Sequence, residues 1–263
     1  MNDGAHDHDA AVQRVARWLA ESRSAVAFTG AGISTESGIP DFRSPSGIWA
    51  QTKPVYFDEF VSSAEARNEY WRQKAAMWRE FSGARPNTGH NILARWEASG
   101  RLRGVITQNI DELHQQAGSQ HVLEVHGTAR HVVCLECGTR YDTERITRQY
   151  ERLGAAPTCD RCGGMLKHAT VSFGQSLPQE VIEESTRWAR ESDLFFAIGS
   201  SLVVYPAASI PEIAARSGSR LVIINRDPTP LDDRASVVIR QSIGEVLERI
   251  DALLPDEPAP EAR

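Results

Sequence analysis

The chain has 263 residues, a formal net charge of −6 and the apolar and charged fractions of an ordinary globular protein. Its basic residues form no run, so we expect no direct nucleic-acid partner, because phosphate binding needs clustered Lys and Arg. No stretch approaches eighteen uninterrupted apolar residues, and residues 1–10 lack the basic and apolar regions of a signal peptide. We therefore expect a cytoplasmic protein with no membrane partner.

Apolar residues at helical spacing in residues 9–22 predict a first helix, and the apolar run at 25–29 predicts a buried strand that ends in a glycine turn. Further short apolar runs lie at residues 102–107, 194–198, 221–225 and 236–239, with helical stretches such as 91–99 and 206–217 between them. This alternation predicts an α/β fold with a doubly wound parallel sheet, whose ligand crevice lies at the carboxyl ends of the strands.

Two stretches interrupt this alternation, and we predict that they form a smaller domain. Residues 47–84 are rich in aromatic and charged residues, with helical spacing near 63–81, and residues 130–167 contain all four cysteines. The large domain then consists of residues 11–46, 85–129 and 168–252. We expect residues 1–10 to be a flexible tail, and residues 253–263, which are proline-rich and acidic, to be disordered.

The four cysteines form two Cys-x-x-Cys pairs, Cys134 with Cys137 and Cys159 with Cys162. Four thiolates complete the tetrahedral shell of Zn²⁺ and leave no position for water, so this pattern predicts one structural zinc ion per chain. Two disulfides, or a redox dithiol in either half, are the alternatives. A reducing compartment favours the metal, and the chemistry then lies elsewhere.

The turn after the first strand, Gly30-Ala31-Gly32, begins like a dinucleotide fingerprint, in which glycines let backbone amides approach a pyrophosphate. The third glycine is missing, so an ordinary strand-to-loop turn explains the pattern about equally well. Residues 37–43 then join flexible, acidic, aromatic and cationic groups in one loop. This composition predicts a loop that closes over a charged ligand.

Polar residues also follow the second strand, at 107–111. Asp111 alone is typical of a helix cap, but Asn109 ahead of it indicates ribose binding. A lone histidine such as His126 is more often structural, yet its near-neutral pKa suits a general base for a sugar hydroxyl. His90 and His114 are weaker candidates.

Small hydroxyl residues and an asparagine follow two later strands, in Gly199-Ser200-Ser201 and Asn225-Arg226-Asp227. Such residues suit an adenosine ribose, although turn formation requires much the same composition. Five stretches of this kind at strand ends favour a binding site over five unrelated turns.

Taken together, these residues resemble the sirtuin family of NAD-dependent protein deacylases, over about residues 12–250. The motifs that carry the resemblance are Gly30-Ala31-Gly32-Ile33-Ser34, Gly38-Ile39-Pro40-Asp41-Phe42-Arg43, Thr107-Gln108-Asn109-Ile110-Asp111, His126-Gly127, the four cysteines and Gly199-Ser200-Ser201-Leu202. The resemblance implies a Rossmann-like large domain and a small domain made of a zinc ribbon, residues 130–167, and a helical module, residues 47–84. NAD and an acyl-lysine peptide would meet in the cleft between them.

The resemblance also implies a mechanism in which the acyl oxygen attacks C1′ of the nicotinamide ribose and expels nicotinamide. His126 would act as base on a ribose hydroxyl, so that the 2′-oxygen attacks the alkylimidate and gives free lysine and 2′-O-acyl-ADP-ribose. Asn109 would hold the ribose or a water, and Asp111 would order the nicotinamide pocket. NAD is then a consumed co-substrate.

By the same resemblance, the peptide adds as a strand between the two domains. The residues expected to bind it are Val171, Phe173, Gly174, Val204 and Tyr205. The residues expected to bind NAD are Gly30, Ala31, Gly32, Ser34, Asp41, Phe42, Arg43, Trp49, Gln108, Asn109, Ile110, Asp111, Gly199, Ser200, Ser201, Asn225, Arg226, Asp227 and Ile243.

The chain departs from the commoner family pattern at residues 167–175, which lack a proline, a second phenylalanine and a glutamate, and at Ser200, where threonine is usual. The Tyr-x-x-Arg pair of succinyl- or malonyl-selective sirtuins is not apparent, so we expect a neutral acyl group. A protein ADP-ribosyltransferase using the same NAD site is the alternative. A non-enzymatic zinc-ribbon module and a hydride-transfer dehydrogenase are disfavoured, and we expect a monomer.

Overall fold

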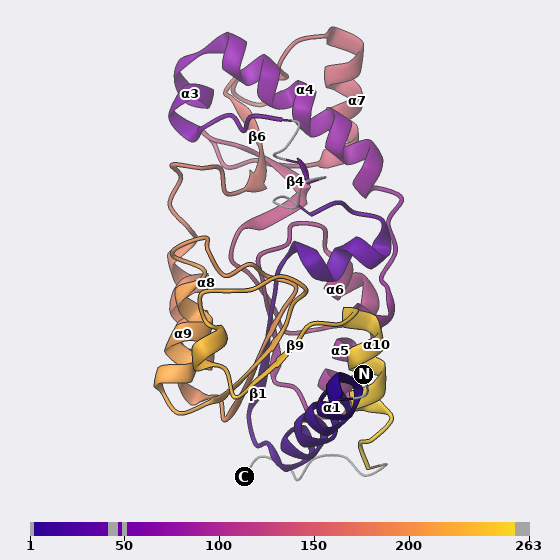
Figure 1. Cartoon of the computed structure of the whole chain (residues 1–263). Helices are drawn as coiled ribbons and strands as arrows, with labels where there is room; N and C mark the ends of the chain where they lie inside the picture. The colour runs from indigo at the N-terminus through magenta and orange to yellow at the C-terminus, as the bar shows by residue number, and fades with distance from the viewer. Residues whose placement is uncertain (1–2, 42–46, 49–51, 256–263) are drawn as a thin grey trace.

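The computed structural model describes residues 3–41, 47–48 and 52–255 and contains two sheets. In Figure 1 the large sheet lies in the lower half of the molecule and the small sheet in the upper half. The large sheet has the order β3-β2-β1-β7-β8-β9, and all of its pairings are parallel. Its strands are β1 (Ala25–Thr29), β2 (Gly104–Thr107), β3 (Val122–Glu124), β7 (Leu194–Ile198), β8 (Arg220–Ile224) and β9 (Val237–Ile239).

The strand order confirms the predicted doubly wound fold and locates its crevice. Strand β1 pairs with β2 on one side and with β7 on the other, so the direction of winding reverses between β1 and β7. Ligands of such sheets bind outside the carboxyl ends of the strands at this point. The predicted apolar runs form β1, β2, β7, β8 and β9, whereas the short β3 had not been expected.

Helices cover both faces of the large sheet because the side chains of each strand alternate between its two faces. Ala27 packs with α1 (Asp3–Glu21), α5 (Thr88–Ala98) and α10 (Ile243–Asp251) in one apolar cluster. Its neighbours Val26 and Phe28 pack with α8 (Gln179–Glu191) and α9 (Ser209–Arg216) in another. Figure 1 shows these two groups of helices on opposite sides of β1.

Both ends of the chain differ from the expected tails. Helix α1 begins at Asp3, so residues 3–10 are helical, and Asp9 pairs with Arg249 of α10, which anchors this part of the helix. Near the other end, Leu254 packs against the apolar core, and Arg101 donates a hydrogen bond to the carbonyl oxygen of Pro255. Leu254 and Pro255 of the expected C-terminal tail therefore contact the folded domain, and the rest of that prediction lies outside the described residues.

The small sheet is antiparallel, with the order β5-β4-β6, and consists of β4 (Gly127–Cys134), β5 (Arg140–Asp142) and β6 (Leu166–Thr170). It extends three residues beyond the expected ribbon at each end, because Gly127 pairs with Thr170.

The ribbon shares its apolar core with the helical module. Helices α3 (Phe57–Ser62) and α4 (Ala64–Phe81) belong to the module, and α7 (Thr143–Leu153) belongs to the ribbon. Trp71 of α4 is fully buried, and its indole N–H donates a 3.0 Å hydrogen bond to the carbonyl oxygen of Leu166. The two stretches that interrupt the large domain thus pack into one unit.

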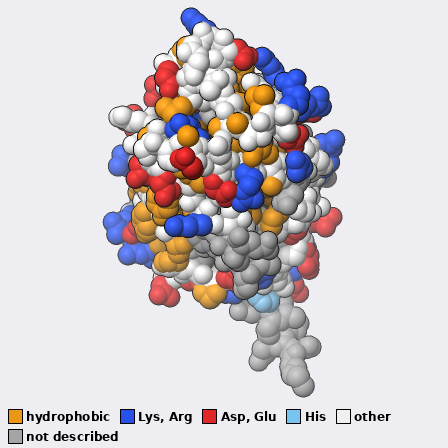
Figure 2. Space-filling model, turned by 90° about the horizontal axis from the view of Figure 1, so that it is seen from above, with side chains coloured by type: hydrophobic (Ala, Val, Ile, Leu, Met, Phe, Trp, Pro, Cys, Tyr) orange, Lys and Arg blue, Asp and Glu red, His pale blue; other side chains and the backbone are white. Residues whose placement is uncertain are grey.

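Two observations bear on the expected partners. Among the described residues, no helix is long and apolar enough to cross a membrane. On the face shown in Figure 2, Lys and Arg side chains are interspersed with Asp and Glu rather than gathered into one basic surface.

Candidate active site

A cleft of about 1700 Å³ lies between the carboxyl edge of the large sheet and the small domain. Most of the predicted site residues line it, although they come from segments far apart in the sequence. Those that line it are Gly30, Ala31, Gly32, Asp41, Gln108, Asn109, Ile110, His126, Val171, Phe173, Gly174, Gly199, Ser200, Ser201, Val204, Tyr205, Asn225, Arg226, Asp227 and Ile243.

The remaining predicted residues of the site fall into two groups. Ser34 and Asp111 do not line the cleft but lie behind its wall, both buried. Phe42, Arg43 and Trp49 lie outside the described residues.

The glycine turn after β1 packs directly against the turn after β7. A Cβ atom on Gly32 would lie 2.7 Å from Cα of Gly199, and one on Gly199 would lie 2.4 Å from the nitrogen of Ile33. The N–H of Gly32 donates to the carbonyl of Gly199 at 2.8 Å, and that of Gly30 donates to Ile198 at 3.0 Å. These glycines therefore join two strand ends at the wall of the cleft, and the expected contact with a pyrophosphate remains a prediction.

Asn109, Ser34 and Asp111 form one buried network. The side-chain amide of Asn109 donates to the carbonyl of Gly30 at 3.2 Å and to Oγ of Ser34 at 3.1 Å. The Ser34 hydroxyl donates in turn to Asp111 at 2.8 Å. Burial raises the pKa of Asp111, although hydrogen bonds from Leu113 and Ser34 oppose this shift. Asp111 thus fixes the orientation of Asn109 from behind, through the hydroxyl of Ser34.

His126 lies in the link between β3 and β4, where the chain leaves the large sheet. The following Gly127 has φ +70°, and a Cβ there would lie 2.0 Å from the carbonyl oxygen of Ala169, so only glycine fits this turn. Nδ1 of His126 lies 3.0 Å from the carbonyl oxygen of Gln108. Because a carbonyl only accepts, Nδ1 carries the proton in the neutral ring, and Nε2 is the nitrogen that can accept one.

Other strand-end residues connect neighbouring loops. The side chain of Gln108 donates to Oγ of Ser200 at 2.7 Å, which ties the loop after β2 to the loop after β7. Asn225 donates to the carbonyl of Asp227 at 2.7 Å, and Arg226 pairs with Asp227 at 3.3 Å on the surface. These last three residues line the cleft and also stabilise their own turn.

The two expected peptide-binding segments flank the cleft. The segment after β6 is held in place by the N–H of Phe57, which donates to the carbonyl of Phe173 at 2.9 Å, and by Tyr56, whose ring lies 5.7 Å from that of Phe173. On the other segment, Val203 is 49% exposed and Tyr205 is 61% exposed. Tyr205 therefore presents its ring beside the cleft that it lines.

The cleft also contains residues that the sequence had not indicated. Gln241 and Ser242 line the cleft shortly after the end of β9. The expectation that ligand-binding residues follow the carboxyl ends of the strands would have indicated them as well. Lys74 and Met77 of α4 line the cleft from the small domain. No local pattern marks these two, because their place depends on how the small domain packs over the sheet.

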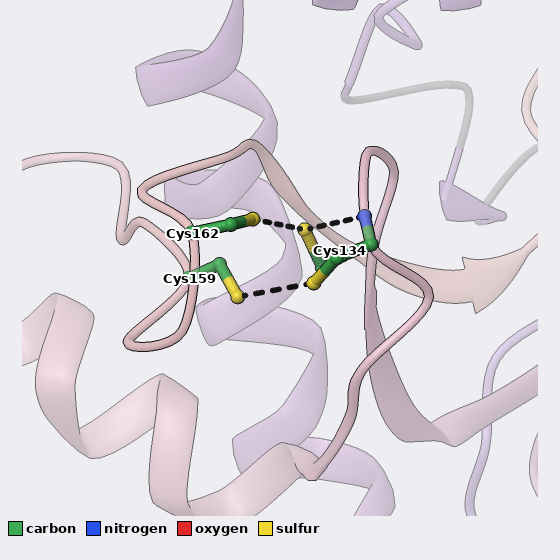
Figure 3. A group of neighbouring side chains, drawn as sticks. Cys134, Cys159 and Cys162 are labelled. Atoms are coloured by element: carbon green, nitrogen blue, oxygen red, sulfur yellow. Dashed lines mark hydrogen bonds between the residues drawn. The ribbon is translucent and has the colours of Figure 1, made fainter.

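The four cysteine sulfurs lie within 4.8 Å of one another, and Figure 3 shows Cys159 and Cys162 facing Cys134 from a separate loop. Sulfur separations are 3.5 Å for Cys134 and Cys162 and 3.6 Å for Cys137 and Cys159. Tetrahedral zinc with bonds of about 2.3 Å requires sulfurs about 3.8 Å apart. The arrangement fits zinc, and all four cysteines are free, so the disulfide alternative fails.

Hydroxyl groups surround the sulfurs as outer partners. The hydroxyl of Tyr141 lies 3.0 Å from the sulfur of Cys159, and that of Thr139 lies 3.2 Å from the sulfur of Cys137. Such groups orient thiolate ligands. Since four thiolates leave no open coordination position, the metal would hold the ribbon together and take no part in the chemistry of the cleft.

A parallel sheet with a ligand crevice at its switch point, covered by a four-cysteine ribbon, defines a two-domain α/β protein with a site between the domains. A model of the Sir2 family matches residues 30–206. The chain is 51% identical to NAD-dependent protein deacetylase 1 of Bradyrhizobium diazoefficiens, over 92% of this chain and 96% of that protein. It is 49% identical to the NAD-dependent protein deacetylase of Rhodopseudomonas palustris, over 90% and 94%.

Solved structures agree with these relatives. A Sir2 structure with a p53 peptide and NAD⁺ superposes with a TM-score of 0.83 at 38% identity, over 91% of this chain and 96% of that one. Another, Sir2 bound to acetylated peptide, gives a TM-score of 0.84 at 37% identity, over 92% and 97%. The chain belongs to the Sir2 family, the sirtuins.

Proposed function

We propose that this chain is an NAD-dependent protein deacetylase, which removes acetyl groups from lysine side chains and releases nicotinamide and 2′-O-acetyl-ADP-ribose. The observation that carries the proposal is His126, held at Nδ1 by Gln108 so that Nε2 can accept a proton in the cleft. The names of the two relatives and the Sir2 structures with NAD⁺ and acetylated peptide support it.

Each group of cleft residues has a role in this proposal. The loops after β1, β7 and β8 bind NAD, with Asn109 oriented by Ser34 and Asp111 toward the ribose. His126 removes a proton from a ribose hydroxyl, which makes that oxygen a nucleophile toward the acyl carbon. The near-neutral pKa of an imidazole suits this step.

The acyl-lysine peptide lies between the segment after β6 and the segment that contains Tyr205. Strand addition at two exposed edges uses backbone hydrogen bonds for affinity and leaves sequence selectivity to a few side chains. The lysine side chain then enters the cleft toward His126. Zinc, held by the four cysteines, keeps the ribbon edge in place, and a site of four thiolates suits the reducing cytoplasm.

Replacing His126 with Ala tests the proposal. We expect turnover of an acetyl-lysine peptide with NAD to fall by about 10²- to 10⁴-fold, because a general base contributes about that much. Peptide binding and zinc content should not change, since the four cysteines are untouched and the backbone bond from the N–H of Val171 to the carbonyl of residue 126 does not involve the side chain. Turnover that persists in His126→Ala would exclude the assignment of the base.

The wild-type protein distinguishes the two reactions that share this NAD site. Incubation with labelled NAD and an acetylated peptide should give acetyl-ADP-ribose and free lysine. Labelled protein without acetyl-ADP-ribose would instead identify an ADP-ribosyltransferase.

A further inference from the structure

Two histidines meet in the core below the cleft. His90 on α5 is 0% exposed and His114 on α6 (Leu113–Ala117) is 1% exposed, and their ring centroids are 4.8 Å apart. In the described structure, Nε2 of His90 and Nδ1 of His114 are buried without a hydrogen-bond partner. A buried polar atom without a partner costs about 1–3 kcal/mol, so two of them side by side require an explanation.

The contacts of His90 define which of its nitrogens carries the proton. The backbone N–H of Asn87 donates to Nδ1 of His90, with a separation of 3.4 Å. A nitrogen that accepts a hydrogen bond is not protonated, so the neutral ring carries its proton on Nε2. The unpartnered atom of His90 is therefore a donor.

The contacts of His114 define its tautomer through two threonines. Nε2 of His114 lies 2.9 Å from Oγ1 of Thr29, and the Thr29 hydroxyl donates to Oγ1 of Thr107 at 2.8 Å. A hydroxyl has a single proton, so Thr29 accepts from His114, whose proton is then on Nε2. The unpartnered Nδ1 of His114 is therefore an acceptor.

The opposite direction of these hydrogen bonds is less favourable. If Thr107 donated to Thr29 and Thr29 donated to His114, the His114 proton would move to Nδ1. A water between the rings would then accept a hydrogen bond from each of them, and its own two protons would lack acceptors in the core. Only the first arrangement gives a donor on His90 and an acceptor on His114.

We propose that His90 and His114 are positioning residues, joined through one water in a chain of hydrogen bonds that runs through Thr29 and Thr107 to the active-site loop. The chain ends at Thr107, whose Oγ1 also accepts from the backbone N–H of Asn109 at 3.0 Å. Its role in turnover rests on the proposed deacetylase function.

Burial supports the neutral state that this chain requires. Burial lowers the pKa of His90 to about 4 and lowers that of His114 well below its ordinary value, with the nearby His90 as a second cause for His114. A second proton on either ring would place two donors opposite each other and break the chain.

Nitrogen NMR of the ¹⁵N-labelled protein at neutral pH tests the arrangement without reference to activity. We expect both rings to be neutral, with the proton on Nε2 in each, and the Nε2–H of both to be protected from exchange. A proton on Nδ1 of His114, or a charged ring on either residue, would overturn the proposal. This result stands even if the protein proves to have a different activity.

Kinetics tests the positioning role. His114→Leu removes the donor to Thr29, and we expect kcat to fall about tenfold or more with little change in KM for the peptide, because small displacements of catalytic groups cost turnover. His114→Gln keeps an N–H donor at the place of Nε2 and should recover most of this loss. Thermal unfolding of each variant shows whether it is folded.

His121→Leu is the matched control, because His121 has an exposed side chain that pairs with Glu97 and lies outside the chain of hydrogen bonds. If His114→Leu is folded and turns over as fast as His121→Leu, the positioning role is refuted. If His114→Leu does not fold, the positioning role is tested by comparing kcat in His114→Gln and His114→Asn. The side chain of Asn is shorter than that of Gln, so its amide cannot reach Thr29. Equal kcat in these two variants would refute the positioning role.

Discussion

The two sheets of this protein are stabilised in different ways. Strands β1 and β7 of the large sheet are buried along their whole length, and they pack against apolar helices on both faces. The small sheet has three strands and buries charged and polar groups, among them Lys167 at 1% exposure and His168 at 2%. A three-stranded sheet has little apolar surface to bury, so it requires another source of stability.

The buried amines show what the small domain tolerates. Nζ of Lys167 donates to the carbonyl of Thr170, and both Lys167 and Lys74 lie 5.7 Å from the ring of Tyr70. Burial, with the charge of Lys74 as a second cause, lowers the pKa of Lys167 to about 7. Burying the Lys167 amine therefore lowers the stability of the small domain. Zinc bound by the four cysteines would compensate for this loss.

Metal removal gives the largest expected difference between the two sheets. Structural zinc stabilises small domains by about 10 kcal/mol or more, so stripping it with a chelator should unfold the small domain and abolish turnover. Hydrogen exchange should show loss of protection in β4 and β6, while β1 and β7 stay protected. Zinc should restore activity. Full turnover in protein shown to be free of metal would contradict this view of the small domain.

In the large sheet, the comparable weak point is the backbone contact between the strand ends. Gly199→Ala places a Cβ 2.4 Å from the nitrogen of Ile33 at φ +62°, so we expect a loss of several kcal/mol, on the order of 3, and weaker NAD binding. Gly218→Ala is the control, since it has φ +95° with nothing within 4 Å and should lose only about 1 kcal/mol. Denaturant unfolding measures both, and equal losses would mean that the strand-end contact is unimportant.

Lys167→Met tests the cost of the buried charge through pH. Because the folded pKa of about 7 lies below the ordinary 10.5, the unfolded chain binds more protons between these values. The free energy of unfolding of the wild type should therefore rise relative to that of Lys167→Met from about pH 7 to pH 10.5, by on the order of 5 kcal/mol. Parallel stability curves for the two proteins would show that Lys167 is not desolvated.

The exposed ion pairs of the small domain should have the smallest effect on the free energy of unfolding. Arg79 of α4 pairs with Glu151 of α7 at 2.6 Å, with side-chain exposures of 68% and 35%. Exposed pairs are worth about 0–1 kcal/mol, so Arg79→Ala should change the free energy of unfolding by about 0.5 kcal/mol or less. A loss above about 2 kcal/mol would show that this link between module and ribbon, and not the metal alone, holds the small domain.

Features with a local cause could be predicted from the sequence. The buried strands could be found because parallel strands are continuous apolar runs, and the metal site because two Cys-x-x-Cys pairs suffice for four ligands. Polar residues at predicted strand ends also indicated Asn109 and the loops after β7 and β8, which line the cleft.

Features that depend on the packing of distant chain segments could not be predicted from the sequence. Lys74 faces the cleft only because α4 packs on the ribbon, and His90 meets His114 only because α5 and α6 pack together. The amides of Gly30 and Gly32 bond to the end of β7, which no local pattern in their turn indicates. Each of these outcomes depends on which chain segment lies beside another.

Synthesis on the ribosome separates the two halves of the small domain in time. The side chain of Trp71 on α4 cannot reach its native contact until β6 has been synthesised, because its hydrogen-bond partner Leu166 lies 95 positions later in the chain. At about 5–20 residues per second, this delay lasts about 5 to 20 seconds. Cys159 and Cys162 also emerge late, so the domain that begins to form early is completed only after most of the chain has been made.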